Sequence, residues 1–139
     1  MKEYFPGIGK IKFEGKESTN PLAFRYYDPE KMVYGRKMKD WFKFAMAYWH
    51  TLCAESSDPF GEETKDFEWN NGSEVIERAK KKVDAGFEFM QKIGIEYFCF
   101  HDVDLVDSGD SLEEYEANLK TIVAYIKGKM ADTGIKILW

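Results

Sequence analysis

An alternation of strand-like and helix-like segments constrains the fold of this chain more than any other feature of its sequence. Residues 73–93 carry apolar side chains three and four positions apart, which predicts an amphipathic helix. Ser73 can cap the start of this helix, and Gly94 can end it. The expected apolar stripe consists of Val75, Ile76, Ala79, Val83, Phe87, Met90 and Ile93. Residues 95–100 then form a short apolar run of the kind that a parallel sheet buries on both faces.

A second helix and a further strand continue this pattern. Ser111 and Glu114 form a capping box. The apolar stripe that follows consists of Leu112, Tyr115, Leu119, Ile122, Val123, Ile126 and Met130. Gly134 comes next, and the run IKILW at residues 135–139 begins a third strand. The order strand, helix, strand, helix, strand, with short turns between them, predicts an α/β fold in which all strands are parallel.

The first strand is harder to place, because residues 38–52 (MKDWFKFAMAYWHTL) fit two periods. Trp41, Ala45, Tyr48 and Leu52 would share one face of a helix, whereas Phe42, Phe44, Met46 and Tyr48 alternate as in a strand. The residue types of FKFAMAYWH favour a strand over residues 42–50, which a short helical turn can precede. We expect the aromatic residues of this segment to lie in the core rather than in a ligand site; they are Trp41, Phe42, Phe44 and Tyr48.

The ends of the chain differ from its middle. Residues 1–36 are rich in Gly, Pro, Lys and Tyr, and we interpret them as an irregular arm that lies on another surface, of the same subunit or of a neighbour. Residues 37–139 would then hold the strands and helices, and Trp139 falls inside the third strand. Because a parallel sheet of three strands would leave two edges exposed, we expect the chain to be the first part of a longer (β/α) polypeptide, truncated in strand 3.

Composition excludes several classes of function. The net charge of −5 argues against binding a nucleic-acid backbone, and we expect the longest basic run, residues 80–82, to be a solvated helix face. No apolar run is long enough for a membrane helix, and the N-terminus lacks the apolar core of a signal peptide. Cys53 and Cys99 show neither a metal-binding spacing nor a disulfide framework, and Cys99 is expected to be a buried hydrophobe. A cytoplasmic setting fits these features.

The stretch FCFHDVDL, residues 98–105, carries the residues best suited to chemistry. His101 follows the second strand at its C-terminal end, where (β/α) barrels place their active sites. Asp104 lies three residues further on and can accept a hydrogen bond from one ring nitrogen, which fixes the tautomer of the other. The pair can serve as a general acid and base near neutral pH.

Other interpretations of this stretch stay open at this point. A histidine at a strand end can be a structural residue, and Asp102 can cap a turn or helix. His50 also follows a predicted strand and could face the same pocket, although packing in or near the core is the plainer expectation. Asp102 and Asp104 alone do not make a metal site, because hard divalent cations prefer several oxygen ligands.

The whole pattern resembles xylose isomerase, of the longer class with an N-terminal extension. The resemblance runs through YFPGIGKIKFEG, NPLAFRYY, MKDWFKFAMAYWHT, DPFG, FCFHDVDL and the final KILW, and it covers essentially all 139 residues as the N-terminal third of such an enzyme. The combination of DPFG with FHDVDL is far more specific than a histidine near an aspartate. The resemblance implies a TIM (β/α)8 barrel of which this chain holds the first β-α-β-α-β part.

The resemblance also implies an activity and roles for single residues. The family interconverts D-xylose and D-xylulose, and D-glucose and D-fructose, by a hydride shift that uses two divalent cations (Mg²⁺, Mn²⁺ or Co²⁺), and it assembles as a homotetramer. By this resemblance, His101 assists opening of the sugar ring and Asp104 orients it. Trp49 and Trp139 resemble the aromatic walls of the sugar pocket. Phe60 in DPFG resembles the residue that reaches into the neighbouring subunit's site.

The chain departs from the family in what it lacks. The cation ligands and the catalytic lysine of the family lie on later strands, so we expect residues 1–139 to bind no metal and to be inactive alone. Two other hypotheses remain at this stage. The chain could be a non-catalytic α/β assembly module in which His101 is structural, or part of another TIM-barrel sugar isomerase or epimerase.

Overall fold

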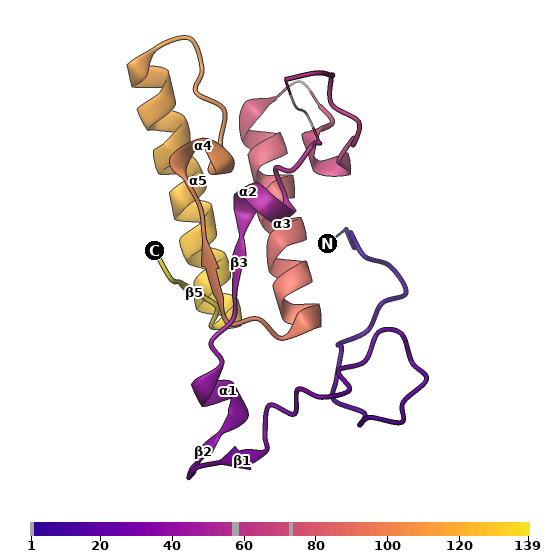
Figure 1. Ribbon diagram of the computed structural model, residues 1–139. Helices are drawn as coiled ribbons and strands as arrows, with labels where there is room; N and C mark the ends of the chain where they lie inside the picture. The colour runs from indigo at the N-terminus through magenta and orange to yellow at the C-terminus, as the bar shows by residue number, and fades with distance from the viewer. Residues whose placement is uncertain (1, 57–58, 73) are drawn as a thin grey trace.

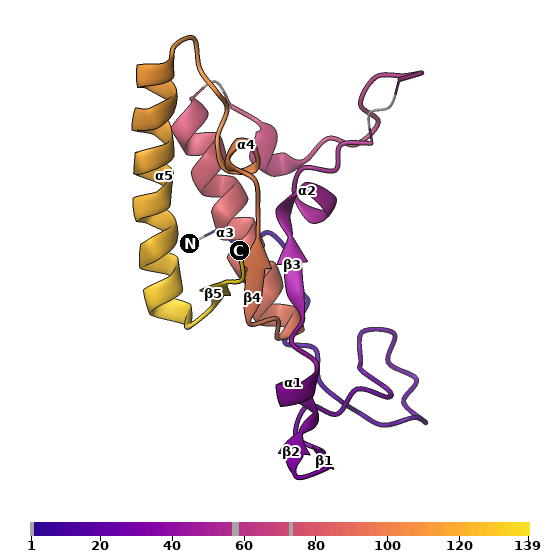
Figure 2. The ribbon, with the colours of Figure 1, turned by 60° about the vertical axis from the view of Figure 1, so that its left-hand side comes forward.

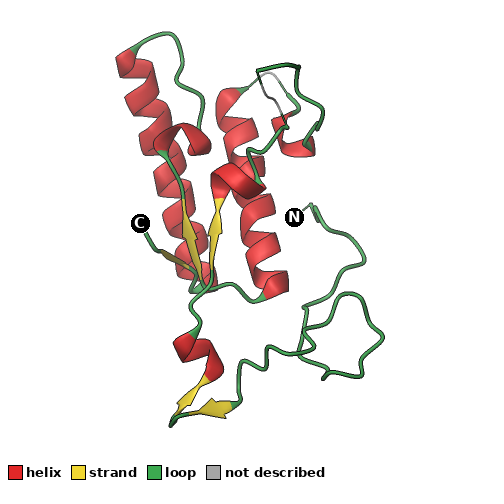
Figure 3. Ribbon diagram, viewed as in Figure 1, coloured by secondary structure: helices red, strands yellow, loops and turns green. Residues whose placement is uncertain are grey.

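A parallel three-stranded sheet and two long helices form the body of the molecule (Figures 1 and 3). The computed structural model describes residues 2–56, 59–72 and 74–139. The strands are β3 (Ala45–Ala47), β4 (Tyr97–Cys99) and β5 (Lys136–Ile137), and they pair in the order β3-β4-β5. Helix α3 (Val75–Ile93) leads from β3 to β4, and α5 (Leu112–Thr133) leads from β4 to β5. The predicted α/β order with parallel strands is therefore confirmed.

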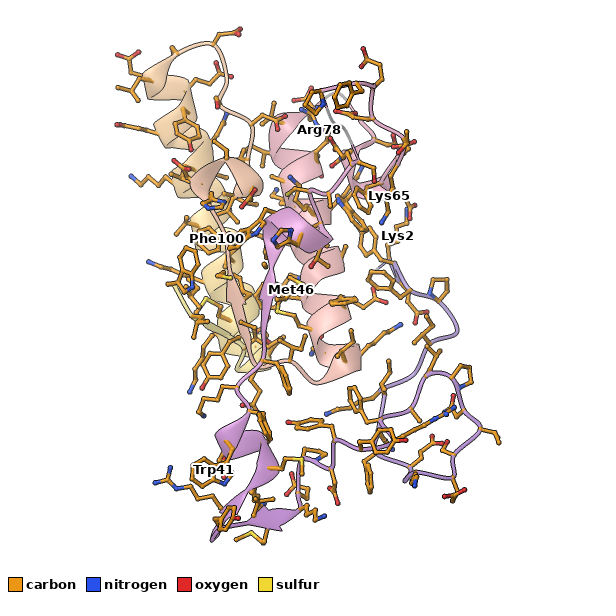
Figure 4. All side chains as sticks on the ribbon, viewed as in Figure 1. Lys2, Trp41, Met46, Lys65, Arg78 and Phe100 are labelled. Carbon is orange, nitrogen blue, oxygen red and sulfur yellow. The ribbon has the colours of Figure 1, made fainter. Side chains whose placement is uncertain are left out.

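The two long helices pack side by side on one face of the sheet, and the core lies between these layers (Figure 2). Phe98 in β4 is fully buried, and its ring lies 5.5 Å from that of Phe87 on α3. Met46 in β3 occupies the space between β3 and α3 (Figure 4). Helix α5 contributes Ile122 and Ile126 to the same core. The stripes read from the sequence are thus the buried faces, except that Leu112 at the start of α5 is 71% exposed.

The ends of the helices show which capping predictions hold. Gly94 and Gly134 both adopt the left-handed conformation, with φ of 81° and 75°, and end α3 and α5. Ser73 lies outside the described residues. The side chain of Ser111 accepts a hydrogen bond from the Glu114 N–H at 3.1 Å. The Glu114 carboxylate, however, accepts from the Asp110 N–H at 3.0 Å, one residue before the position that a capping box requires.

The segment 38–52 is more broken than the predicted strand. It forms α1 (Met38–Trp41), then the three residues of β3, then α2 (Tyr48–Thr51), so the short helical turn is confirmed and the strand over 42–50 is too long at both ends. Pairing begins only where Ala45 meets Tyr97. Tyr48 is fully buried as predicted.

The core prediction is wrong for the three aromatic residues that precede β3. Trp41, Phe42 and Phe44 are 48%, 56% and 53% exposed, because they lie outside the part of the chain that the helices cover. The ring of Phe44 packs edge-on against Tyr27 of the arm at 5.3 Å. Trp41 projects from α1 away from the long helices (Figure 4).

The N-terminal arm is tied to α3. The Glu88 carboxylate accepts hydrogen bonds from the N–H groups of Tyr4 and Phe5 at 2.7 and 3.0 Å, and the Ile11 N–H donates to the Lys92 carbonyl at 2.7 Å. Burial raises the pKa of Glu88, but the hydrogen bonds from Lys92, Tyr4 and Phe5 outweigh this effect and leave it lowered. The charged form of Glu88 therefore holds the arm.

The rest of the arm leads into a small hairpin. Strands β1 (Met32–Val33) and β2 (Arg36–Lys37) pair antiparallel across a two-residue turn at Tyr34 and Gly35, which have φ of 47° and 79°. The boundary between arm and body at residues 36–37 falls within β2 and stays a prediction. None of the helices in the described ranges combines the length and apolar character that crossing a bilayer requires.

Candidate functional site at the ends of the parallel strands

Three aromatic rings meet where the three parallel strands end. Trp49 follows β3, His101 follows β4 and Trp139 follows β5, each two positions beyond the last strand residue. The ring centroids of Trp49 and His101 are 4.5 Å apart, those of Trp49 and Trp139 are 5.7 Å apart, and those of His101 and Trp139 are 6.4 Å apart. Because parallel strands end at the same edge of a sheet, the register alone brings together residues that are distant in sequence.

His101 and Asp104 form the polar part of this site. His101 precedes the single turn α4 (Asp102–Leu105), and this turn folds Asp104 back toward it. One carboxylate oxygen of Asp104, Oδ2, lies 2.7 Å from the backbone nitrogen of His101 and 3.1 Å from its ring Nδ1. The predicted pairing of His101 with Asp104 is present in the structure.

The exposure of the two partners differs in a way that suits acid–base chemistry. The side chain of Asp104 is only 9% exposed, whereas that of His101 is 54% exposed. A neutral imidazole that donates from Nδ1 to the buried carboxylate leaves Nε2 as a proton acceptor. The site therefore presents an oriented base beside two indole rings.

The other candidates near this site are placed differently. The carboxylate of Asp102 is exposed and accepts from the Val103 N–H at 3.0 Å, whereas the N-cap position of α4 is occupied by His101. Its pKa is lowered, first by the Tyr115 hydroxyl and then by that N–H group. His50 is exposed at the end of α2, and its ring centroid lies 5.7 Å from that of Trp49; it therefore packs beside the residues of the site and not within the core.

Phe60 stands apart from the three rings. It lies between α2 and the short helix η1 (Glu68–Asn70), and its side chain is 97% exposed, which a ring packed into the cluster could not be. The structure thus brings together four of the five site residues predicted from the sequence. The roles of all five stay predictions.

The prediction of a solvated face for the basic run on α3 is wrong for Lys82, whose hydrogen bond to another segment is partly buried, whereas the hydrogen bond of Lys81 is exposed. Lys81 donates to the carbonyl of Asn71 at 2.9 Å, and Lys82 donates to the carbonyl of Asp104 at 3.0 Å. Cys53 also donates to the Asp104 carbonyl, with a sulfur–oxygen distance of 3.6 Å. Helical periodicity identifies which residues face the core, but it gives no signal for a lysine that reaches a carbonyl of another segment.

The described residues do not form a metal centre, since no three His, Cys, Asp or Glu side chains in these ranges gather closely enough to hold an ion. Cys53 and Cys99 are both free thiols, and Cys99 is buried as predicted. The site consists of one acid–base pair and an aromatic surface, and both lie just beyond the ends of the strands.

The sequence of the chain is closely similar to those of proteins named xylose isomerase. The chain is 71% identical over 138 residues to a protein named xylose isomerase from Phocaeicola vulgatus, and 70% identical to one from Bacteroides thetaiotaomicron. Its sequence matches part of xylose isomerase. The match covers 99% of this chain, so the resemblance indicated by the motifs is confirmed over nearly its whole length.

More distant xylose isomerases show the same relationship. A protein named xylose isomerase 2 from Xanthomonas campestris is 52% identical over the same 138 residues. The chain spans about a third of the length of these relatives, 32% for the Phocaeicola vulgatus protein and 31% for the Xanthomonas campestris protein. No protein-family model matches the chain.

Proposed function

We propose that this chain functions as part of a complete xylose isomerase, an enzyme that converts D-xylose to D-xylulose and D-glucose to D-fructose. In that enzyme the three parallel strands would be the first strands of a (β/α)8 barrel, and the subunits would form a homotetramer. The observation that carries the proposal is the convergence of His101, Asp104, Trp49 and Trp139 at one edge of the sheet. The identity of about 70% to xylose isomerases supports it.

In this proposal His101 opens the cyclic sugar. Opening a cyclic hemiacetal removes the proton of the hydroxyl on the first carbon, breaks the bond from that carbon to the ring oxygen, and returns a proton to the ring oxygen. Nε2 of His101 can take the first proton and supply the second, because Asp104 occupies Nδ1 and stabilises the protonated ring. The rings of Trp49 and Trp139 offer flat apolar surfaces for the carbon–hydrogen face of the sugar.

The chemistry after ring opening needs groups that the described residues do not supply. Two divalent cations would polarise the sugar oxygens for the isomerisation, but the described residues contain no cluster of ligands for them. In the complete enzyme the cation ligands would lie in the remainder of the polypeptide.

The test is a chimera with the related protein from Phocaeicola vulgatus. The 138 aligned residues of this chain would replace their counterparts in that protein, and xylulose formation would be measured with Mg²⁺ or Mn²⁺. We expect an active enzyme. A chimera that assembles like the parent protein but forms no xylulose would favour a non-catalytic role, and turnover of another sugar alone would favour a different isomerase or epimerase.

The role of His101 is tested in the same chimera. His101→Asn should reduce the rate on cyclic xylose by about 10²- to 10⁴-fold, the usual contribution of a general acid–base group. An acyclic substrate analogue should recover part of the loss. His50→Asn is the matched control, because His50 also contacts Trp49 but is exposed and lies outside the acid–base pair. Equal rates for His101→Asn and the unsubstituted chimera would remove His101 from the reaction.

A further inference from the structure

The turn that presents Asp104 to His101 is too short to hold itself in place. Helix α4 has four residues, and a single helical turn is marginal in water because few of its backbone groups are paired internally. One backbone bond, from the Asp104 N–H to the His101 carbonyl at 3.0 Å, closes the turn. Within the turn the Asp104 carboxylate accepts a hydrogen bond from the His101 N–H at 2.7 Å, and contacts with other parts of the molecule hold the turn itself.

Two such contacts converge on the backbone carbonyl of Asp104. The Lys82 ammonium donates to it at 3.0 Å from α3, and the Cys53 thiol donates to it at 3.6 Å from the segment after α2. The same residue thus receives bonds from two elements at its carbonyl while its carboxylate binds His101. Leu105 and Val106, which follow, are 0% and 1% exposed and anchor the turn in the core.

Of these two donors, lysine is the stronger. A hydrogen bond from a charged group contributes more than one between neutral groups, and a thiol is a weak donor. A cation also interacts favourably with the carbonyl end of a helical turn. The Lys82 ammonium also interacts electrostatically with the Cys53 thiol and the Glu55 carboxylate. Burial raises the pKa of Cys53, and Lys82 acts in the opposite direction, so Cys53 stays the neutral donor to the same carbonyl.

We infer that Lys82 is a positioning residue for the acid–base pair: by holding the Asp104 carbonyl it fixes the carboxylate that selects the His101 tautomer. The catalytic consequence of this inference rests on the proposed function. The structural part does not, because it concerns which ring nitrogen of His101 carries the proton.

The experiment measures that tautomer directly. Nitrogen-15 NMR of the full chain, labelled at its two histidines, reports the ratio of the Nδ1–H to the Nε2–H form of each ring. Spectra would be taken about two pH units above the ordinary histidine pKa of about 6.5, and His50→Gln would assign the signals. Lys82→Met keeps an unbranched side chain, one heavy atom shorter than that of lysine, and removes the donor. The ratio at His101 should fall about twofold to tenfold, the range expected for losing one hydrogen bond that orients its partner.

Two further variants separate positioning from a general effect of charge or fold. Lys81→Met is the matched control, since Lys81 is the neighbouring lysine of α3 and also donates to a backbone carbonyl, that of Asn71. It removes the same charge and the same kind of bond and should leave the ratio unchanged. Lys82→Arg keeps a cationic donor and should restore most of the ratio. In the chimera, Lys82→Met should lower kcat on cyclic xylose more than on an acyclic analogue.

Each outcome of these measurements either supports or overturns the inference. An unchanged ratio in folded Lys82→Met, or an equal fall in Lys81→Met, would overturn the inference. If Lys82→Met does not fold, Lys82→Leu, which also lacks a donor, takes its place and is judged by the same two criteria. An inactive chimera would count against the proposed function while leaving the tautomer result intact, so the two failures can be told apart.

Discussion

A substitution at Gly86 tests how closely α3 packs against the segment of residues 46–52, which contains Trp49. A β-carbon added at Gly86 would lie 2.8 Å from Cδ1 of Leu52, 3.3 Å from the Tyr48 hydroxyl and 3.4 Å from Cε of Met46. All three neighbours are at least 97% buried, so none can move its side chain into solvent. Replacement by alanine therefore has two opposing effects on stability.

The relative sizes of these two effects decide whether Gly86→Ala stabilises or destabilises the fold. Alanine is favoured over glycine inside a helix by about 1 kcal/mol. Forcing a methyl group into a packed core costs about 1–3 kcal/mol. Gly86→Ala should therefore destabilise the fold by a net amount of about 0–2 kcal/mol. Gly128→Ala on α5 is the matched control, because nothing lies within 4 Å of a β-carbon there. The higher helix propensity of alanine alone should therefore raise the unfolding free energy of that variant, by about 1 kcal/mol.

The assay is urea unfolding of both variants and the unsubstituted chain, followed by far-ultraviolet circular dichroism. The difference in unfolding free energy between the two alanine variants isolates the packing cost and should be about 1–3 kcal/mol, provided that the slopes against urea agree. The opposite finding, that Gly86→Ala stabilises the chain as much as Gly128→Ala, would show that Met46, Tyr48 and Leu52 do not pack closely against α3 at Gly86.

Two further predictions concern the arm and the exposed loop. The pKa of Glu88 is lowered in the folded state, so its charged form adds stability at pH values above the ordinary pKa of 4.5, and this contribution is lost as the pH falls through the folded-state pKa. Glu88→Gln should therefore destabilise the chain at pH 7, and its stability should converge with that of the unsubstituted protein in acid. Thermal unfolding measured against pH tests this. A constant difference at every pH would contradict this. In the chimera, Phe60→Ala should raise KM. If Phe60 contributes to the site of a neighbouring subunit, mixed tetramers of Phe60→Ala and His101→Asn subunits should be more active than the average of the two single-variant tetramers. Activity equal to that average would show that it does not.

The long helices and the His101–Asp104 pair could be predicted from the sequence because short-range patterns specify them, whereas Trp49, Phe60 and Trp139 were indicated only by the resemblance to xylose isomerase. A stripe from Val75 to Met90 identifies the buried face of α3, and Gly94 marks its end, whatever the rest of the chain does. The pairing of His101 with Asp104 follows from a spacing of three residues at a strand end. The meeting of His101 with Trp49 then follows from parallel pairing, which places strand ends along one edge.

Other features depend on contacts between segments that no local pattern encodes. Phe42 and Phe44 alternate like strand residues, but they precede the point at which β4 is available for pairing, so their side chains meet solvent and the arm instead. Lys82 lies in a charged run typical of solvated helix faces, and only the fold shows that a carbonyl of α4 comes within reach of its ammonium group. The exposed position of His50 likewise results from the turn of α2, which replaces the end of the predicted strand.

The strands of the sheet pair in the order in which the chain carries them, and this has a consequence for synthesis on the ribosome. β3 leaves the ribosome first, and β4 later finds an edge already present, as β5 does in turn. No strand has to be inserted between two earlier ones, so each pairing joins neighbours that emerge in succession, and domains can begin folding from the N-terminus while translation continues. Trp49, His101 and Trp139 would thus be delivered to the site one at a time, and each new strand pairs at the edge formed by the strand before it.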